Sequence, residues 1–126
     1  MVEYTLTEIP AEKVSLGIPN YGYDWQLPFV RGITEATTIG NVEAIQIAVQ
    51  NNAAISFDQT AQTPFFNYLT SERIWHEVWF EDVRSIRAKF DLIKEYDLYG
   101  AGYWQLMRWW RANWILLQDS FTILRP

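Results

Sequence analysis

Aromatic side chains gather directly after an apolar segment of the sequence, in a place where a ligand could bind. Residues 13–18 are short, apolar and followed by Pro19, a pattern that predicts a buried strand. They lead into residues 20–25, which include Tyr21 and Tyr23. Parallel α/β folds place their ligand sites at the carboxyl ends of strands. We therefore expect this cluster to belong to a binding site.

A second apolar segment ends in the same way. Residues 98–104 predict a buried strand that closes with Tyr103 and Trp104. The chain holds seven Trp, seven Tyr and seven Phe, which is more aromatic surface than a core of this size needs. Some of these rings are therefore expected on a binding surface.

Side chains that could transfer protons or hold a metal are few. Glu81 and Asp82 are an adjacent carboxylate pair, but capping of the helix that follows explains them better than catalysis. His76 is the single histidine and has no Asp, Glu or Cys at ligand spacing, so we expect a structural role. The serines lack a nucleophile motif, and residues 100–102 are too short for a phosphate-binding loop. No metal, cofactor or catalytic residue is expected.

Composition describes a single globular domain. The 126 residues are 49% hydrophobic and 20% charged, and no stretch is long and apolar enough for a membrane span. The absence of cysteine excludes disulfides and thiolate metal sites. Fifteen acidic against ten basic residues give a charge of -5, which opposes a nucleic-acid partner. The first twenty residues lack the features of a secretory signal.

Helical periodicity appears in four places. A short helix ends before Pro10, and Asn41 is expected to cap a helix that ends near residues 50–52. Asp82 is expected to cap a helix of about 15 residues. Its core-facing stripe is Val83, Ile86, Phe90 and Ile93, and a final helix places Trp110, Trp114 and Leu117 at helical spacing.

Strand signals lie between these helices. Residues 26–40 are expected to be irregular because Pro and Gly punctuate them, and residues 53–57 predict a strand. Residues 64–69 and 74–80 predict a hairpin, with His76 and Val78 on one face and Trp75 and Trp79 on the other. The last residues, 122–126, are expected to taper off.

The order of elements favours a parallel crossover interrupted by an insertion. Two buried strands, 13–18 and 98–104, flank a small α+β unit and a helix. Two parallel strands do not make a stable sheet alone. Since a closed (β/α)8 barrel takes about 250 residues, this chain could supply only the end of one.

Four segments resemble glycoside hydrolase family 18, the chitinase-like enzymes. LGIPNYGYDW at residues 16–25 is similar to the seventh barrel strand of that family. FDQTAQTPFFNY at 57–68, EVWFEDVRSIRAKFDLIKEY at 77–96 and GAGYWQL at 100–106 resemble the bacterial spore cortex-lytic glycosylases within it. The resemblance spans nearly the whole chain.

This resemblance implies an α/β fold with an α+β insertion. The chain would hold the last two βα units of a TIM (β/α)8 barrel plus the chitinase insertion domain, which is an incomplete barrel. Residues 1–25 would be a barrel helix end and the seventh strand, and residues 26–80 the insertion. Residues 81–126 would be the seventh helix, the eighth strand and the final helix, all in one compact unit.

The resemblance also implies a sugar-binding wall without the acid. The family's general acid closes a D-x-x-D-x-D-x-E motif, which no stretch of this sequence contains. Tyr21 and Tyr23 match the tyrosines of the family's YGY motif. Trp104 matches the tryptophan that forms the floor beneath the sugar at the family's cleavage point. An aromatic ring offers a flat apolar face to the C–H bonds of a pyranose, and tyrosine hydroxyls bond its oxygens. Residues 107–114 depart from the family pattern.

Each of these residues also has a plainer interpretation. Trp104 and Tyr21 could be packed in the core, since both uses bury a ring. Tyr23, Asp24 and Trp25 could form a tight turn held by the aspartate side chain and ring stacking. The pair Trp109–Trp110 could be an exposed patch that favours self-association.

Three functional hypotheses follow. The chain is the carboxyl-terminal part of a glycosylase that cleaves β-1,4 bonds at N-acetylglucosamine in spore peptidoglycan or chitin-like glycan, and is itself inactive. Alternatively, it is a non-catalytic glycan-binding module, or a structural remnant that forms a homo-oligomer to cover its strand edges. The resemblance places the parent protein at the spore or cell wall.

Overall fold

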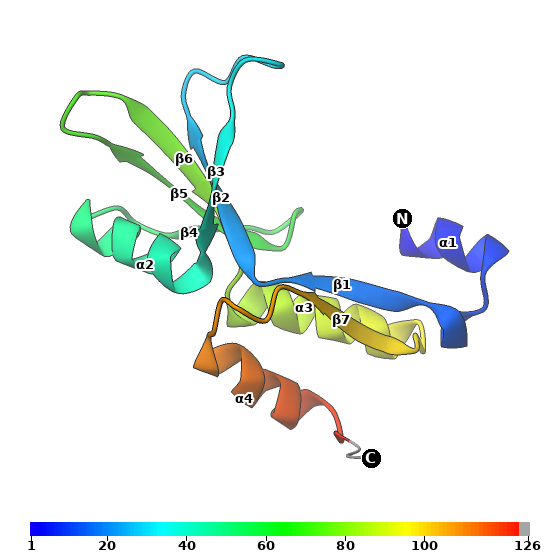
Figure 1. The fold of residues 1–126 in the computed structure, drawn as a ribbon. Helices are drawn as coiled ribbons and strands as arrows, with labels where there is room; N and C mark the ends of the chain where they lie inside the picture. Colours follow the sequence, from blue (N-terminus) through cyan, green and yellow to red (C-terminus); the bar gives the residue numbers. More distant parts are fainter. Residues whose placement is uncertain (124–126) are drawn as a thin grey trace.

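Two sheets and four α-helices make up residues 1–123 of the protein (Figure 1). The computed structural model describes residues 1–123, so residues 124–126, the end of the predicted final segment, lie outside the described part. In chain order the elements are α1 (Val2–Glu8), the 3-10 turn η1 (Ala11–Lys13), β1 (Ser15–Pro19), β2 (Tyr21–Gln26), β3 (Ala36–Gly40), α2 (Asn41–Gln50), β4 (Ser56–Asp58), β5 (Thr63–Leu69), β6 (Trp75–Trp79), α3 (Val83–Glu95), β7 (Gly100–Trp104) and α4 (Arg111–Ser120).

The smaller sheet is the predicted pair of parallel strands, but the prediction that both are buried is wrong, since Ile18 is the single buried residue of β1 and β7 has none. β1 and β7 run side by side in register from Ser15 opposite Gly100 to Pro19 opposite Trp104. One face packs against α3 and α4 (Figure 1). The core between them consists of Ile18, Ile86, Phe90, Ile93, Leu98 and Leu116. The predicted stripe on α3 is thus confirmed, except that Val83, in the first turn, is exposed.

The larger sheet is antiparallel, with strand order β3-β2-β6-β5-β4. Its hairpin β5–β6 confirms the prediction, and α2 covers one face through a second core of Ile39, Ala44, Ala48, Phe66, Val78 and Phe80. The predicted strand at 53–57 is shorter and later, at Ser56–Asp58.

Two strands of this sheet were not expected. Residues 21–25 were assigned to the end of the preceding strand or to a turn, but they form β2 of the larger sheet. Residues 36–40, expected to be irregular, form β3. The inward positions of β2 are Gly22 and Asp24, so the strand lacks the apolar alternation that marks a half-buried strand. Hydrogen bonding of β2 to β3 and β6 therefore determines that these residues form a strand.

The predicted helix caps are partly confirmed. Asp82 caps α3, because its Oδ1 accepts a hydrogen bond from the Ser85 backbone N–H at 3.2 Å. The cap of α2 is Gly40 and not Asn41, and the Glu43 carboxylate accepts from the Gly40 N–H at 3.1 Å. Asn41 is the first residue of the helix, and its side chain accepts from the backbone N–H of Glu81.

Gly22 lies where β2 passes closest to the end of β6. A Cβ at this position would stand 2.5 Å from the Trp79 carbonyl oxygen and 2.6 Å from the Phe80 Cβ. We expect Gly22→Ala to lower the free energy of unfolding by about 1–3 kcal/mol through overpacking. Urea unfolding measures this, with Gly17→Ala as the control because its Cβ would meet nothing within 4 Å. Equal stability of the two variants would contradict the prediction.

Within residues 1–123, no helix has both the length and the apolar character that a membrane crossing requires.

Candidate functional site

The carboxyl ends of β1 and β7 meet at one edge of the molecule. Pro19, the last residue of β1, lies opposite Trp104, the last residue of β7. Asn20 follows β1 and is only 2% exposed, and its Nδ2 donates a hydrogen bond to the Gln105 carbonyl oxygen at 3.0 Å. Parallel pairing thereby places Tyr21 and Trp104 at the same end of the smaller sheet.

Trp104 presents its ring to solvent. The residue is 68% exposed and belongs to neither hydrophobic core of the described residues. Gly17 and Gly102 lie on the same face of the smaller sheet, and each would leave open space within 4 Å of an added Cβ. The ring therefore stands beside an unobstructed surface.

An aromatic row continues from this edge along β2. Tyr21, Tyr23 and Trp25 alternate with inward residues and so share the face of the larger sheet that lies away from α2. The ring centroids of Tyr21 and Tyr23 are 5.5 Å apart, and those of Tyr23 and Trp25 are 6.1 Å apart. Phe29 extends the row, with its centroid 5.4 Å from that of Trp25.

The same face carries a stacked aromatic pair on the neighbouring strands. Trp79 lies opposite Tyr23, and its ring stacks on Phe65 with centroids 4.6 Å apart. Glu77 accepts a hydrogen bond from the Trp79 indole N–H at 2.8 Å and another from the Asn67 amide at 3.3 Å. Rings and polar groups thus alternate on this surface, as they do where proteins hold amphipathic ligands.

The surroundings of Tyr21 move the pKa of its hydroxyl further above the ordinary tyrosine value, so the phenol is neutral at physiological pH, as an unperturbed tyrosine also is. Burial is the main cause that raises the pKa of Tyr21, followed by the neighbouring Tyr23 and the negative charge of Glu81. A neutral phenol at physiological pH can both donate and accept a hydrogen bond. Tyr21 therefore suits contact with a polar, uncharged ligand.

Asp24 faces away from this aromatic surface. Its Oδ2 accepts a hydrogen bond from the Tyr68 hydroxyl at 2.6 Å, and its Oδ1 lies 2.8 Å from the His76 Nδ1. The carboxylate thus ties β2 to β5 and β6, and the alternative of a tight turn around Asp24 is wrong. Three or more metal-ligating side chains do not converge anywhere in residues 1–123. His76 has the structural contact expected of it.

The Asp24–Tyr68 contact makes stability sensitive to alkaline pH. Burial, then the hydrogen bond to Asp24 and its negative charge, raises the pKa of Tyr68 well above its usual range. The raised pKa stabilises the fold fully below about pH 10, the ordinary tyrosine pKa, and this contribution is lost as the pH rises towards the folded-state value.

We therefore expect the free energy of unfolding to fall as the pH rises above about 10 towards the raised folded-state pKa of Tyr68. Tyr68→Phe should flatten this slope, while Tyr21 and Tyr103, whose pKa values are also raised, keep part of it. Urea unfolding at each pH measures the slope, with exposed Tyr99→Phe as the control. A slope that Tyr68→Phe leaves unchanged would show that the Asp24–Tyr68 contact does not cause the pH dependence of stability.

The adjacent carboxylates Glu81 and Asp82 have different tasks. Glu81 is buried, and both of its carboxylate oxygens accept hydrogen bonds from the Lys89 ammonium, at 2.9 and 2.8 Å. Asp82 caps α3 and accepts from the Arg84 guanidinium. The expectation that capping explains both carboxylates is therefore wrong for Glu81. Both are occupied by structural partners, so neither is free to transfer a proton.

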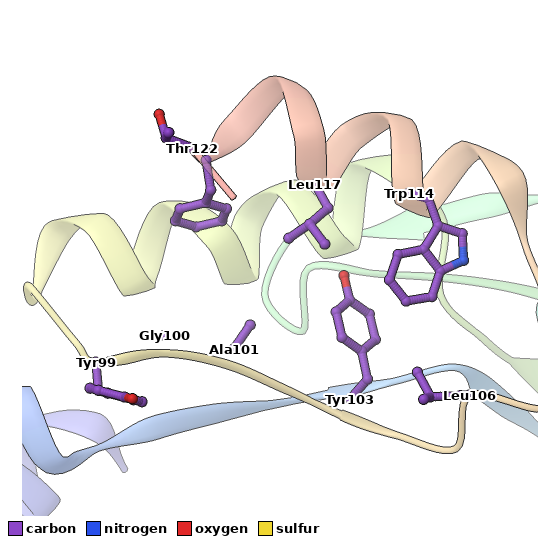
Figure 2. A pocket seen from close by; sticks show the side chains of 9 residues that line it. Tyr99, Gly100, Ala101, Tyr103, Leu106, Trp114, Leu117 and Thr122 are labelled. Carbon is purple, nitrogen blue, oxygen red and sulfur yellow. The ribbon is translucent and has the colours of Figure 1, made fainter. Parts of the chain in front are cut away.

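A separate apolar hollow of about 560 Å³ lies between β7 and α4. Tyr103 points into it from β7, towards Trp114 and Leu117 on α4 (Figure 2). The Tyr103 hydroxyl donates to the Asn113 Oδ1 at 3.1 Å. Because Tyr103 and Trp104 alternate along β7, this hollow opens on the helix side, away from the Trp104 face. Sequence reasoning did not foresee it.

The edge that carries Tyr21, Tyr23 and Trp104 offers groups suited to ligand contact. Its groups are flat rings and phenol hydroxyls, and the carboxylates Asp24 and Glu81 nearby in the sequence are held by other side chains. This chemistry fits the stacking of a ligand with apolar C–H faces and polar edges.

Comparison with known proteins gives a consistent result. The family model for glycosyl hydrolases family 18 matches residues 1–108. The cortical fragment-lytic enzyme of Bacillus subtilis (strain 168) is 53% identical over 125 residues, which are 99% of this chain and 29% of that enzyme. The chain therefore spans less than a third of the length of this relative.

Solved structures agree. The spore cortex-lytic enzyme SleL of Bacillus megaterium QM B1551 matches 99% of this chain and 29% of its own, with a TM-score of 0.94 and 46% identity. A chitinase from Chromobacterium violaceum ATCC 12472 matches 94% of this chain and 36% of its own, with a TM-score of 0.84 and 26% identity. The resemblance found in the sequence is confirmed, and the chain belongs to glycosyl hydrolases family 18.

Proposed function

We propose that this chain is the carboxyl-terminal part of a family 18 catalytic domain. In this proposal β1 and β7 are the seventh and eighth strands of a (β/α)8 barrel, and the larger sheet with α2 is the chitinase insertion domain. Two observations support it: within residues 1–123, β1 and β7 pair in parallel with each other and with no other strand, and the chain matches 29% of SleL. The structure begins the larger sheet at Tyr21, so we place the start of the insertion there and not at residue 26.

We further propose that the parent enzyme hydrolyses β-1,4 bonds at N-acetylglucosamine in spore peptidoglycan or a chitin-like glycan. The observation that carries this is the exposed Trp104 ring at the strand edge it shares with Tyr21. A pyranose can stack on Trp104 while the tyrosine hydroxyls bond its oxygens. The chain supplies this wall, and the general acid comes from another part of the enzyme.

Exchange of the matched segment tests this proposal. The matching 125 residues of the Bacillus subtilis cortical fragment-lytic enzyme are replaced by this chain, and lysis of cortical fragments is assayed. We expect the chimera to retain activity and the isolated 126-residue chain to release no N-acetylglucosamine. A chimera that folds but lyses nothing would refute the proposed role. Turnover by the pure chain would refute its inactivity.

Glycan binding without cleavage is the second candidate, favoured by the same exposed ring. If the isolated chain binds, its tryptophan fluorescence should shift on addition of N-acetylglucosamine oligomers. We also propose that the isolated chain self-associates, since β1 and β7 each pair on one side only among the described residues. A strictly monomeric mass by light scattering at high concentration would refute self-association.

A further inference from the structure

The segment between β7 and α4, residues 105–110, touches both sheets. At its start, the Gln105 carbonyl accepts the hydrogen bond from Asn20 at the end of β1. Further along, the Arg108 Nη2 donates to the Thr38 carbonyl of β3 at 3.2 Å. We call these residues the 105–110 loop. It links the end of the smaller sheet to an edge strand of the larger one (Figure 1).

Arg108 reaches the larger sheet on the face that carries the aromatic row. Gly40 lies opposite Tyr21, and a Cβ on Gly40 would stand 3.8 Å from the Arg108 Nη1 and 3.9 Å from its Cδ. Directly opposed residues of an antiparallel pair project to the same face. The Arg108 side chain therefore lies next to the Tyr21 position, and its guanidinium is bonded to the strand beside it.

The loop is held in a conformation that it would not adopt unaided. Gln105 has a φ of 74°, in the left-handed region that a residue with a Cβ disfavours. The Nη1 of Arg108 is buried without a hydrogen-bond partner among the described residues. Backbone strain of this kind costs stability. Strained backbone is typical of segments that hold functional side chains in position.

Several contacts set the angle between the two sheets, because α3 packs against β5 and its Arg84 lies over the Phe57 ring of β4 at 4.5 Å. The chain passes from β1 to β2 through the single residue Asn20. The Glu81 backbone N–H donates to Asn41 near the start of α3, and the Arg108–Thr38 bond is the tie on the side of the aromatic row. Tyr21 and Tyr23 belong to one sheet and Trp104 to the other, so this angle determines how the rings face one another.

We infer that Arg108 is a positioning residue that holds the larger sheet, with Tyr21 and Tyr23, in a defined orientation towards Trp104. The consequence for glycan cleavage rests on the proposed function, but the orientation itself does not. Arg108 acts through the backbone of β3 and needs no contact with a ligand.

Spin labels test the orientation directly, because the chain has no cysteine of its own. Nitroxides are attached to Glu12→Cys on the smaller-sheet side and Glu72→Cys at the β5–β6 turn, both exposed positions. Pulsed electron spin resonance then gives the distribution of distances between them. We expect a narrow distribution in the parent and a broader one in Arg108→Ala. An unchanged distribution would overturn the inference.

Two further variants keep this test decisive. Arg111→Ala removes the same charge from an exposed position three residues away and should leave the distribution narrow. Arg108→Met keeps an aliphatic stem over Gly40 but cannot donate, so it serves where the alanine variant does not fold. We expect it to broaden the distribution, and a narrow distribution in a folded Arg108→Met would refute the role of the hydrogen bond.

The chimera described above provides the functional arm. Misplacement of a binding wall by about 1 Å can cost about 100-fold in rate. We therefore expect Arg108→Ala to lower kcat/KM by roughly 10- to 100-fold with the urea midpoint unchanged. If the parent chimera is inactive while Arg108→Ala broadens the spin-label distances, the proposed function fails and the positioning role stands. Full activity in a chimera carrying Arg108→Ala would overturn the positioning role.

Discussion

Replacement of Trp104 by alanine in the chimera should weaken glycan binding by about 10- to 100-fold. Full burial of a large apolar side chain against a ligand is worth about 1.5–3 kcal/mol, and each 1.4 kcal/mol is tenfold in affinity. The ring is 68% exposed without ligand, so its removal leaves no cavity in either core. Titration with an N-acetylglucosamine tetramer and the rate of cortical-fragment lysis measure the loss.

Trp75→Ala is the matched control for this experiment. Trp75 is also exposed, at 53%, and shares the outer face of the larger sheet with Trp79, but it lies at the opposite end of β6, beside the turn that closes the β5–β6 hairpin, and not on the sheet that carries Trp104. Its replacement should leave binding and lysis within about twofold, as expected for a surface substitution. If both variants lost affinity equally, the effect would be general, and Trp104 would not be the sugar platform.

The second large effect is on stability. Lys89→Met should lower the free energy of unfolding by about 3–5 kcal/mol, because it leaves the Glu81 carboxylate buried without its cation. The Glu81 side chain is 9% exposed, and Lys89 is its salt-bridge partner at 2.8 Å. Methionine keeps the length and the apolar stem of lysine, so the loss of charge dominates. Urea unfolding followed by tryptophan fluorescence measures the change.

Two comparisons isolate the ion pair. Lys13→Met removes a lysine from an exposed position in η1 and should change stability by less than about 0.5 kcal/mol. The double variant Glu81→Gln with Lys89→Met removes both charges and should recover part of the loss. A double variant as unstable as Lys89→Met alone would show that lost packing of Lys89, and not the unpaired carboxylate, is responsible.

Local patterns were enough for the elements that rest on neighbours in the sequence. The α3 helix is predicted by apolar residues at three- and four-residue steps and by Asp82 before its first turn. The Asp82 side chain accepts hydrogen bonds from backbone N–H groups only two and three positions ahead. The β5–β6 hairpin follows from two β-rich runs around a polar turn. The parallel pairing of β1 and β7 followed from two apolar runs separated by an inserted unit and a helix.

The candidate binding site can be predicted only in part from local sequence patterns. The segment YGYDW marks Tyr21 and Tyr23 as unusual, but its pattern does not show that they lie on a strand. Gly22 is required there because Phe80, far along the chain, passes within contact distance. No local rule contains that information.

Contacts between distant residues decide the remaining features of this protein. Composition and short-range periodicity were sufficient to identify helices, the Asp82 cap, one hairpin and the aromatic positions, because these depend on residues a few places apart. The partner of Glu81 on α3, the bonds of Asp24 to Tyr68 and His76, and the reach of Arg108 to β3 depend on how two sheets pack. The partners in such contacts are residues that are close in space but distant in sequence, so local sequence patterns do not predict them.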